Sequence, residues 1–183
     1  MTRLTGRRLH LARAVAPLVL VATIASACGA GQTTAPDGAI AEGEICGALQ
    51  RPPLQSGSHL IGDTEPPVPY SSNPPSSGWH TSGAIELGVV PSPLTGPQVV
   101  SALEAGNVVV AYDPDLVDAQ DLARLQELAM TSLDGRITVT AWAPMRSTIA
   151  LVGWGALQRC NSLDETVVAA FALSFFGEAQ RHG

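Results

Sequence analysis

The chain has 183 residues, room for one domain plus a targeting segment. All 10 basic residues are arginines, and four of them precede Cys28, where no acidic residue occurs. From Cys28 onward the chain therefore carries 6 Arg against 16 Asp and Glu, a formal charge of −10. Such an acidic chain is poorly suited to neutralise phosphates, which excludes nucleic acid as an expected partner. It also argues against adsorption to anionic lipid by charge, so membrane attachment would need an anchor.

The first 27 residues have the pattern of a bacterial export signal. A basic stretch up to Arg13 precedes the short apolar run AVAPLVLVATIA. A bilayer-spanning helix needs about 20 apolar residues, so this run predicts the apolar region of a signal peptide rather than a membrane span or a buried core helix. The pair Arg7-Arg8 matches a twin-arginine signal only loosely. We therefore expect the mature chain to work outside the cytoplasmic membrane.

The cleavage region Ala25-Ser26-Ala27-Cys28 resembles a bacterial lipobox, in which the cysteine receives a diacylglyceryl group. It departs from the pattern at Ala25, where lipoboxes usually carry Leu. The same residues also form an A-x-A site for ordinary cleavage, which would leave Cys28 as a free N-terminal thiol. The chain has three cysteines, so a lipid on Cys28 leaves an even pair, which favours a lipid anchor. The expected organisation is a signal peptide over 1–27, a lipidated tether over 28–45 and a globular domain over 46–178.

Cys46 and Cys160 are expected to form a disulfide, because the compartment outside the membrane is oxidising. Two buried free thiols or a redox-active pair are the alternatives, but a redox pair usually occurs as a closely spaced C-x-x-C, which the sequence lacks. Residues 47–80 are rich in proline, which excludes a regular helix. This segment is either a disordered arm or an ordered wrap on the core, and a disulfide at Cys46 favours the wrap.

Regular structure is expected from residue 84 onward. The strand-like runs are Ala84–Val90, Asn107–Tyr112, Arg136–Ala143 and Thr148–Gly153. The helical runs are Gln98–Ala105, Leu116–Met130 and a last helix that stops near Gly177. We expect Gly106 to end the first helix, and Ser162 and Glu165 to form a capping box that opens the last one. Pro144 separates the last two strands, which predicts a hairpin or neighbouring strands.

The expected order is β-α-β-α-β-β-α. It predicts a mixed α/β (α+β) single domain with a proline-rich N-terminal wrap. The same order also matches the thioredoxin-like fold.

The stretch Tyr70–His80, YSSNPPSSGWH, resembles the Y-x-x-x-P-P-T-S-G-P-H motif of a bacterial exported lipoprotein family catalogued as domain of unknown function 3105. Further motifs of that family resemble Gly88-Val89, Leu103-Glu104-Ala105-Gly106, Val108–Tyr112 and Gly153–Cys160. His59 lies where members often carry a histidine ahead of the proline-rich stretch. The resemblance covers residues 46–176. It implies a class of envelope protein and no particular chemistry.

Members of this family with several histidines carry them in an H-x-L-E-H-G turn, and Ser101 and Ala105 stand at those positions here. His59 and His80 remain, with Glu104 in the motif. Two imidazoles and a carboxylate are a ligand set for copper or zinc, so metal binding by these three residues is an alternative function. Otherwise both histidines bond the backbone and hold the wrap in place. The sequence predicts no other cofactor.

The run Ser76-Ser77 beside His80 invites a hydrolase interpretation, but catalytic triads assemble residues distant in sequence, and the chain has no G-x-S-x-G motif. The sequence therefore favours a binding domain at the cell envelope over an enzyme. Its expected partner is an unknown protein or envelope component. The residues expected to contact that partner are Tyr70, Pro74, Pro75, Gly78, Trp79 and His80.

Overall fold

The computed structural model describes residues 39–181, apart from Asp63, Ala84 and Asp134. The expected signal peptide, the expected anchor at Cys28 and most of the expected tether lie outside the described residues. Within the described part of the chain, no helix is both long and apolar enough to cross a membrane.

A four-stranded sheet forms the centre of the fold. Its strands are β3 (Val108–Tyr112), β4 (Ile137–Ala141), β5 (Ile149–Gly153) and β6 (Ala156–Cys160). The strand order is β4-β3-β5-β6, with β3 parallel to β4 and antiparallel to β5, and β5 antiparallel to β6. Val dominates β3, and Val and Ile recur in β4 and β5, as expected of strands covered on both faces.

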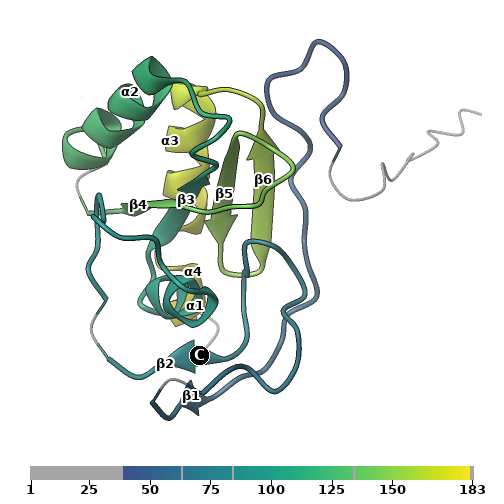
Figure 1. The fold of residues 1–183 in the computed structure, drawn as a ribbon, viewed down its shortest axis with the longest axis vertical. Coiled ribbons are helices and arrows are strands. Elements are labelled where there is room, and N and C mark those ends of the chain that lie inside the picture. Colours follow the sequence, from purple (N-terminus) through teal and green to yellow (C-terminus); the bar gives the residue numbers. More distant parts are fainter. Residues whose placement is uncertain (1–38, 63, 84, 134, 182–183) are drawn as a thin grey trace, which may run out of the picture. The chain divides into compact units, whose positions relative to one another are not determined.

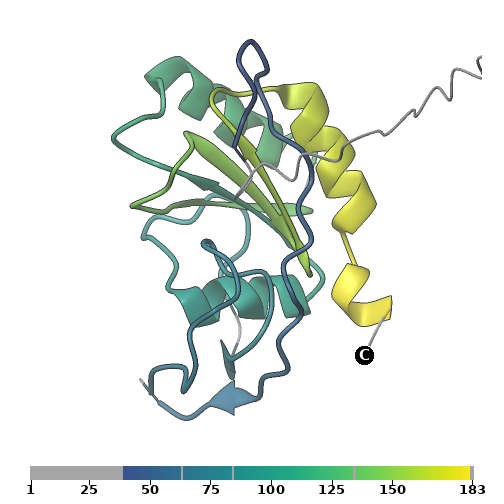
Figure 2. The same ribbon diagram turned by 90° about the vertical axis from the view of Figure 1, so that its right-hand side faces the viewer.

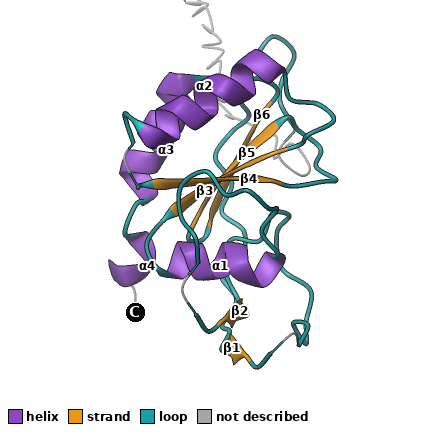
Figure 3. Cartoon of the chain, turned by 60° about the vertical axis from the view of Figure 1, so that its left-hand side comes forward, coloured by secondary structure: helices purple, strands orange, loops and turns teal. Residues whose placement is uncertain are grey.

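Helices cover both faces of this sheet (Figure 3). The helices α2 (Ala119–Met130) and α3 (Glu165–Phe175) pack on one face, and α1 (Gly96–Glu104) packs on the other. Alternate residues of β3 join the two core clusters because successive side chains of a strand point to opposite faces. The short α4 (Glu178–Arg181) contacts the end of α1, where the Gln180 side chain donates to the Ala105 carbonyl at 3.1 Å. The mixed α/β class expected from the sequence is therefore confirmed.

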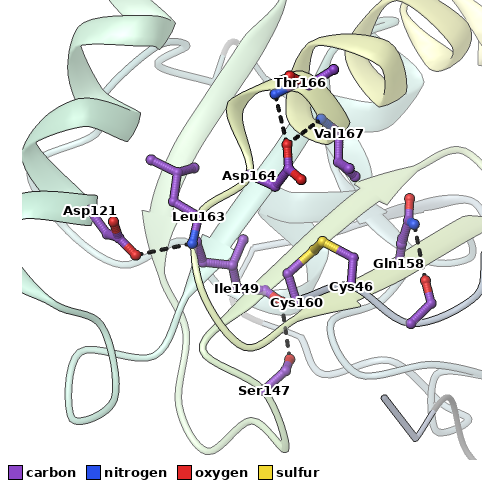
Figure 4. Close-up of a disulfide and its surroundings, with 11 residues drawn as sticks. Cys46, Asp121, Ser147, Ile149, Gln158, Cys160, Leu163, Asp164, Thr166 and Val167 are labelled. Atoms are coloured by element: carbon purple, nitrogen blue, oxygen red, sulfur yellow. Dashed lines mark hydrogen bonds between the residues drawn. A yellow bond between two sulfur atoms is a disulfide. The ribbon is translucent and has the colours of Figure 1, made fainter. Parts of the chain in front are cut away.

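Two expected helix starts are wrong, because aspartates cap these helices. The second helix begins after Asp118, whose carboxylate accepts from a backbone amide two residues on, and Leu116 lies outside it with 55% of its surface exposed. The last long helix begins after Asp164, which accepts from the amides two and three residues later, as Figure 4 shows. The Ser162–Glu165 capping box is therefore not formed. A carboxylate is a strong N-cap, and here it sets the first turn.

The strand expectations need three corrections. Residues 85–90 form no strand, and only Val89 makes a bridge, parallel to Val139 of β4. A positive φ of 83° at Gly88 turns the chain there and limits the pairing. The strands β4 and β5 are not neighbours, since β3 lies between them. The strand β6 was not expected, and it forms a hairpin with β5 through a turn at Gly155. The thioredoxin-like interpretation stays a prediction.

The proline-rich segment begins alongside β6 (Figures 1 and 2). A disulfide joins Cys46 to Cys160, the last residue of β6, across 114 positions of sequence (Figure 4). The Gly47 amide donates to the Arg159 carbonyl at 2.8 Å, and Gln50 and Leu157 exchange two backbone hydrogen bonds. The segment is therefore attached to the sheet by covalent and backbone bonds before it turns away.

Further along, this segment forms a second, two-stranded sheet. The strands β1 (His59–Leu60) and β2 (His80–Thr81) run parallel to each other. Figures 1 and 3 place them on the side of α1 that faces away from the main sheet. The helix α1 therefore separates the main sheet from the small one.

Candidate metal centre

The register of the small sheet places two histidines side by side. His59 of β1 pairs directly with His80 of β2, and paired residues of neighbouring strands project to the same face. Their ring centroids lie 4.6 Å apart, with the ring planes inclined at 72°. Twenty residues of sequence separate these side chains, and the pairing of only two residues on each strand brings them together.

Two glycines permit this pairing. Gly57 and Gly78 each lie two residues before a histidine, in the sequences Gly57-Ser58-His59 and Gly78-Trp79-His80. A Cβ at Gly57 would overlap the peptide bond between Gly78 and Trp79, and Gly78 itself has a φ of 114°. The close approach of the two backbones therefore requires glycine at the first position, and the positive φ favours it at the second.

Polar contacts brace the strand that carries His80. The Tyr70 hydroxyl donates to the Trp79 carbonyl at 2.7 Å, and burial raises the pKa of this phenol to about 12. The backbone amide of Gln55 donates to the Ser77 hydroxyl at 2.9 Å. The loop before His80 is thus fixed by hydrogen bonds from Gln55 and Tyr70, which both precede it in the wrap.

The helix α1 is tied to β2 by one side chain. The Ser101 hydroxyl accepts from the Thr81 amide at 3.0 Å and lies 2.9 Å from both the carbonyl and the hydroxyl oxygen of the same residue. Glu104 follows Ser101 by three positions, so both lie on the same side of the helix. This contact positions the Glu104 carboxylate next to β2.

The His80 ring meets Glu104 through one nitrogen and the backbone through the other. Its Nδ1 lies 3.0 Å from the Gly78 carbonyl oxygen, which can only accept, so Nδ1 carries a proton. Its Nε2 is buried and lies 2.8 Å from Oε2 of Glu104. This contact satisfies the distance for an ion pair, yet Nε2 has no hydrogen-bond partner among the described residues. Rotation of the Glu104 carboxylate about its terminal bond would bring an oxygen into line with Nε2.

In the neutral ring, Nε2 would present a lone pair to the carboxylate, since the proton is on Nδ1. Two acceptors at 2.8 Å repel each other unless a positive charge is shared between them. Protonation of Nε2 or a bound cation would supply that charge. A carbonyl that fixes the far nitrogen is the usual outer-shell support of a histidine metal ligand.

Glu104 lies at an end of α1 that does not itself favour a negative charge. It is the last residue of the helix, where the unpaired carbonyls of the final turn give the helix a partial negative charge. A carboxylate there is stabilised by a nearby cation. The helix α1 therefore adds to the negative potential around Nε2 of His80.

The three side chains form one cluster that is open to solvent on one side. One ligand atom from each of His59, His80 and Glu104 lies within 4.8 Å of the other two. His80 is 4% exposed, whereas His59 and Glu104 are exposed. The buried imidazole is held in place, and the two exposed ligands can adjust by small side-chain rotations. Such an arrangement leaves room for a fourth, solvent-derived ligand.

The loop expected to contact a partner is mostly buried. Pro74, Pro75 and Gly78 are buried, and Tyr70 and Trp79 are half-buried. The neighbouring Ser76 and Ser77 are fully buried, which leaves their hydroxyls to the scaffold. A role of this loop in partner binding stays a prediction.

The pairing of Gly57 with Gly78 was not foreseen, although the sequence holds a signal for it. The pattern G-x-H occurs twice, and a glycine at the same offset before each histidine is what close parallel pairing requires. No comparable signal marks the role of Ser101, since the sequence shows it only as a position where the resembling family carries a histidine.

Comparison with known proteins gives a family and no relative of known activity. No curated protein and no solved structure matches the chain. A family model described as "Protein of unknown function (DUF3105)" matches residues 63–182. The matched part contains His80 and Glu104 and begins after His59. Because it covers more than half of the sequence, the chain belongs to the DUF3105 family.

Proposed function

We propose that this protein is a lipid-anchored binding protein of the cell envelope, and that the ligand of its small sheet is a copper or zinc ion. The metal would be held by His59, His80 and Glu104. The observation that carries the proposal is the contact between the buried Nε2 of His80 and the Glu104 carboxylate, with a second imidazole beside them.

The chemistry of the ligands favours these two metals. Zn²⁺ binds imidazole nitrogen at about 2.0–2.1 Å and carboxylate oxygen at about 2.0–2.2 Å, usually with four ligands in all. Imidazole also suits Cu²⁺, which binds nitrogen and oxygen donors more tightly than Zn²⁺ does in most sites. Calcium and magnesium prefer sites made of oxygen donors alone. A site with two nitrogen ligands and one oxygen ligand therefore selects against calcium and magnesium.

The proposed location outside the membrane rests on the sequence before residue 29. Lipid on Cys28 would hold the domain at the membrane surface, with the segment up to Cys46 as the connection. The Cys46–Cys160 disulfide supports an oxidising compartment. Replacement of Cys28 by Ser should release the protein from membranes of the expressing bacterium, as checked by fractionation. Retention of the Cys28→Ser protein in the membrane fraction would overturn the anchor.

Metal binding is tested by calorimetric titration of the purified chain with Zn²⁺ and Cu²⁺. We expect one equivalent to bind with a dissociation constant of about micromolar or tighter. The double variant His59→Ala/His80→Ala should lose this binding. A matched control is the variant His182→Ala, which replaces a histidine that is not one of the three proposed ligands and should bind as the parent does.

The variant Glu104→Gln tests whether Glu104 is a metal ligand or only forms an ion pair with His80. The amide keeps the size of the side chain and removes its charge, so metal affinity should fall by about 10-fold or more, the effect of one lost charged ligand. Absence of binding to the parent protein, or equal binding to parent and double variant, would overturn the proposed function.

A further inference from the structure

A separate cavity of about 560 Å³ lies where the wrap crosses β6. It shares no lining residue with the candidate metal centre. Four segments form its walls: the first pass of the wrap (residues 50–52), its second pass (residues 70–73), the β4–β5 connection and β6. Its lining includes Gln50, Arg51, Pro52, Arg146, Leu157 and Arg159.

The charge of this cavity is opposite to that of the chain. Three arginines line it, and none of its described lining residues is acidic. From Cys28 onward the chain has only 6 Arg against 16 acidic residues, so half of its arginines gather here. The other three lie outside the cavity, where Arg124 pairs with Glu165, Arg181 pairs with Glu178, and Arg136 lies over the Phe176 ring. Of the cavity arginines, Arg51 also lies over a ring, 4.8 Å from the centre of Phe175.

Arg159 is the fixed member of this set. It lies on β6 and is only 8% exposed. Its guanidinium donates to the Gln50 side-chain oxygen at 2.8 Å and to the Asn73 carbonyl at 2.9 Å. These two bonds hold the guanidinium between the two passes of the wrap. A charge held in a partly buried wall acts on an anion through a lower effective dielectric than one in water.

The Gln50 side chain adds a second hydrogen-bond donor to the wall, beside the Arg159 guanidinium. Because the Gln50 oxygen accepts from Arg159, the orientation of its amide group is fixed. The Nε2 atom of Gln50 is buried and has no hydrogen-bond partner among the described residues. A buried N–H without a partner is unfavourable, and a ligand oxygen would satisfy it.

We propose that this cavity binds a small organic anion that carries a carboxylate or phosphate group. The oxyanion meets Arg51, Arg146 and Arg159, because guanidinium groups match both anions with paired hydrogen bonds. Pro52 and Leu157 lie in the same wall and contact the apolar part of the ligand. A volume of about 560 Å³ is far larger than an inorganic anion requires and lies in the range of small-molecule sites.

The test uses three probes that share one aromatic ring: benzoate, phenyl phosphate and benzyl alcohol. Each is titrated into the full chain at constant ionic strength, with binding followed by calorimetry or NMR. We expect one or both anions to bind at a single site, at least about tenfold more tightly than the neutral alcohol. Binding of benzoate alone assigns a carboxylate ligand, and binding of phenyl phosphate alone assigns a phosphate ligand.

Two variants locate the binding in the cavity. Arg51→Gln and Arg146→Gln replace exposed side chains, so the fold should persist, and thermal unfolding checks that it does. Each variant should lower the affinity for the anion by about tenfold, the effect of one lost charged hydrogen bond. The control Arg124→Gln removes an arginine outside the cavity and should leave affinity unchanged. Failure of both anions to bind, or equal weakening by the control, would overturn the proposal.

Discussion

Gly57 packs directly on the backbone of Gly78. The carbonyl group of Gly78 occupies the space that a Cβ atom on Gly57 would need. Two residues beyond each of these glycines stands a histidine, and the two histidines pair in register. The distance between the imidazole rings is therefore set by a backbone contact, before any side-chain interaction is considered. This contact connects a glycine in the sequence to the geometry of the candidate metal centre.

Replacement of Gly57 by Ala should separate β1 from β2. The methyl group would force the backbones apart, with a loss of about 1–3 kcal/mol in the free energy of unfolding, as for other overpacked sites. Metal affinity should fall by about tenfold or more, because His59 would move away from His80. Calorimetry and urea unfolding measure the two effects.

The control for this variant is Gly43→Ala. Gly43 has a φ of 84° and no atoms within 4 Å of an added Cβ, so it reports backbone strain without overlap. It should lose stability and keep the metal affinity of the parent. Equal metal affinity in the Gly57→Ala protein would contradict the proposed role of the glycine contact.

Removal of the Ser101 hydroxyl should loosen α1 from β2. Ser101→Ala leaves the partly buried amide of Thr81 without its acceptor, which should lower the free energy of unfolding by about 1–3 kcal/mol. Metal affinity should fall as well, because Glu104 would be held less firmly. Ser174→Ala serves as the control, since Ser174 is exposed and bonds only a carbonyl of its own helix. A Ser101→Ala protein as stable as the control would count against this contact.

The Tyr70 phenol should make stability fall at high pH. Burial raises its pKa in the folded chain from 10.0 to about 12. Below pH 10 the phenol is neutral in both states, so it adds no pH dependence. Between pH 10 and 12 the unfolded chain ionises first, so the folded state loses stability as the pH rises. Urea unfolding across this range should show the loss in the parent and a smaller one in Tyr70→Phe. Identical curves for the parent and for Tyr70→Phe would refute the assignment.

Cutting the Cys46–Cys160 disulfide should strongly destabilise the fold. The bridge closes a loop of 114 positions, for which the chain-entropy model gives roughly 4–5 kcal/mol as an upper value. Urea unfolding with and without reductant measures the difference. The double variant Cys46→Ala/Cys160→Ala should match the reduced parent and should not respond to reductant. An unchanged midpoint on reduction would mean that the disulfide does not hold the wrap.

The sequence predicted the elements whose pattern is local. The helix α1 and its end at Gly106, the run of valines in β3 and the helix α2 are all found within a few residues of their expected bounds. Local signals failed where two of them competed. Asp164 caps the last helix in place of Ser162, because a carboxylate next to the first turn reaches two amides at once.

The parts that the sequence could not predict depend on pairing between distant segments. Nothing local in Ile137–Ala141 or Ile149–Gly153 indicates that β3 lies between them. The three candidate ligands were named from their chemistry, but their proximity follows from the register of two short strands and from the packing of α1 on β2. The arginine-lined cavity depends on four segments that meet only in the folded chain.

We propose that one metal ion lies between His59, His80 and Glu104. The most direct measurement is crystallography of the protein grown with Zn²⁺, with diffraction recorded at energies on both sides of the zinc absorption edge. The proposal predicts one anomalous peak within about 2.0–2.2 Å of an imidazole nitrogen of each histidine and of a Glu104 oxygen. An anomalous map with no peak at this cluster, or with zinc bound only elsewhere, would contradict it.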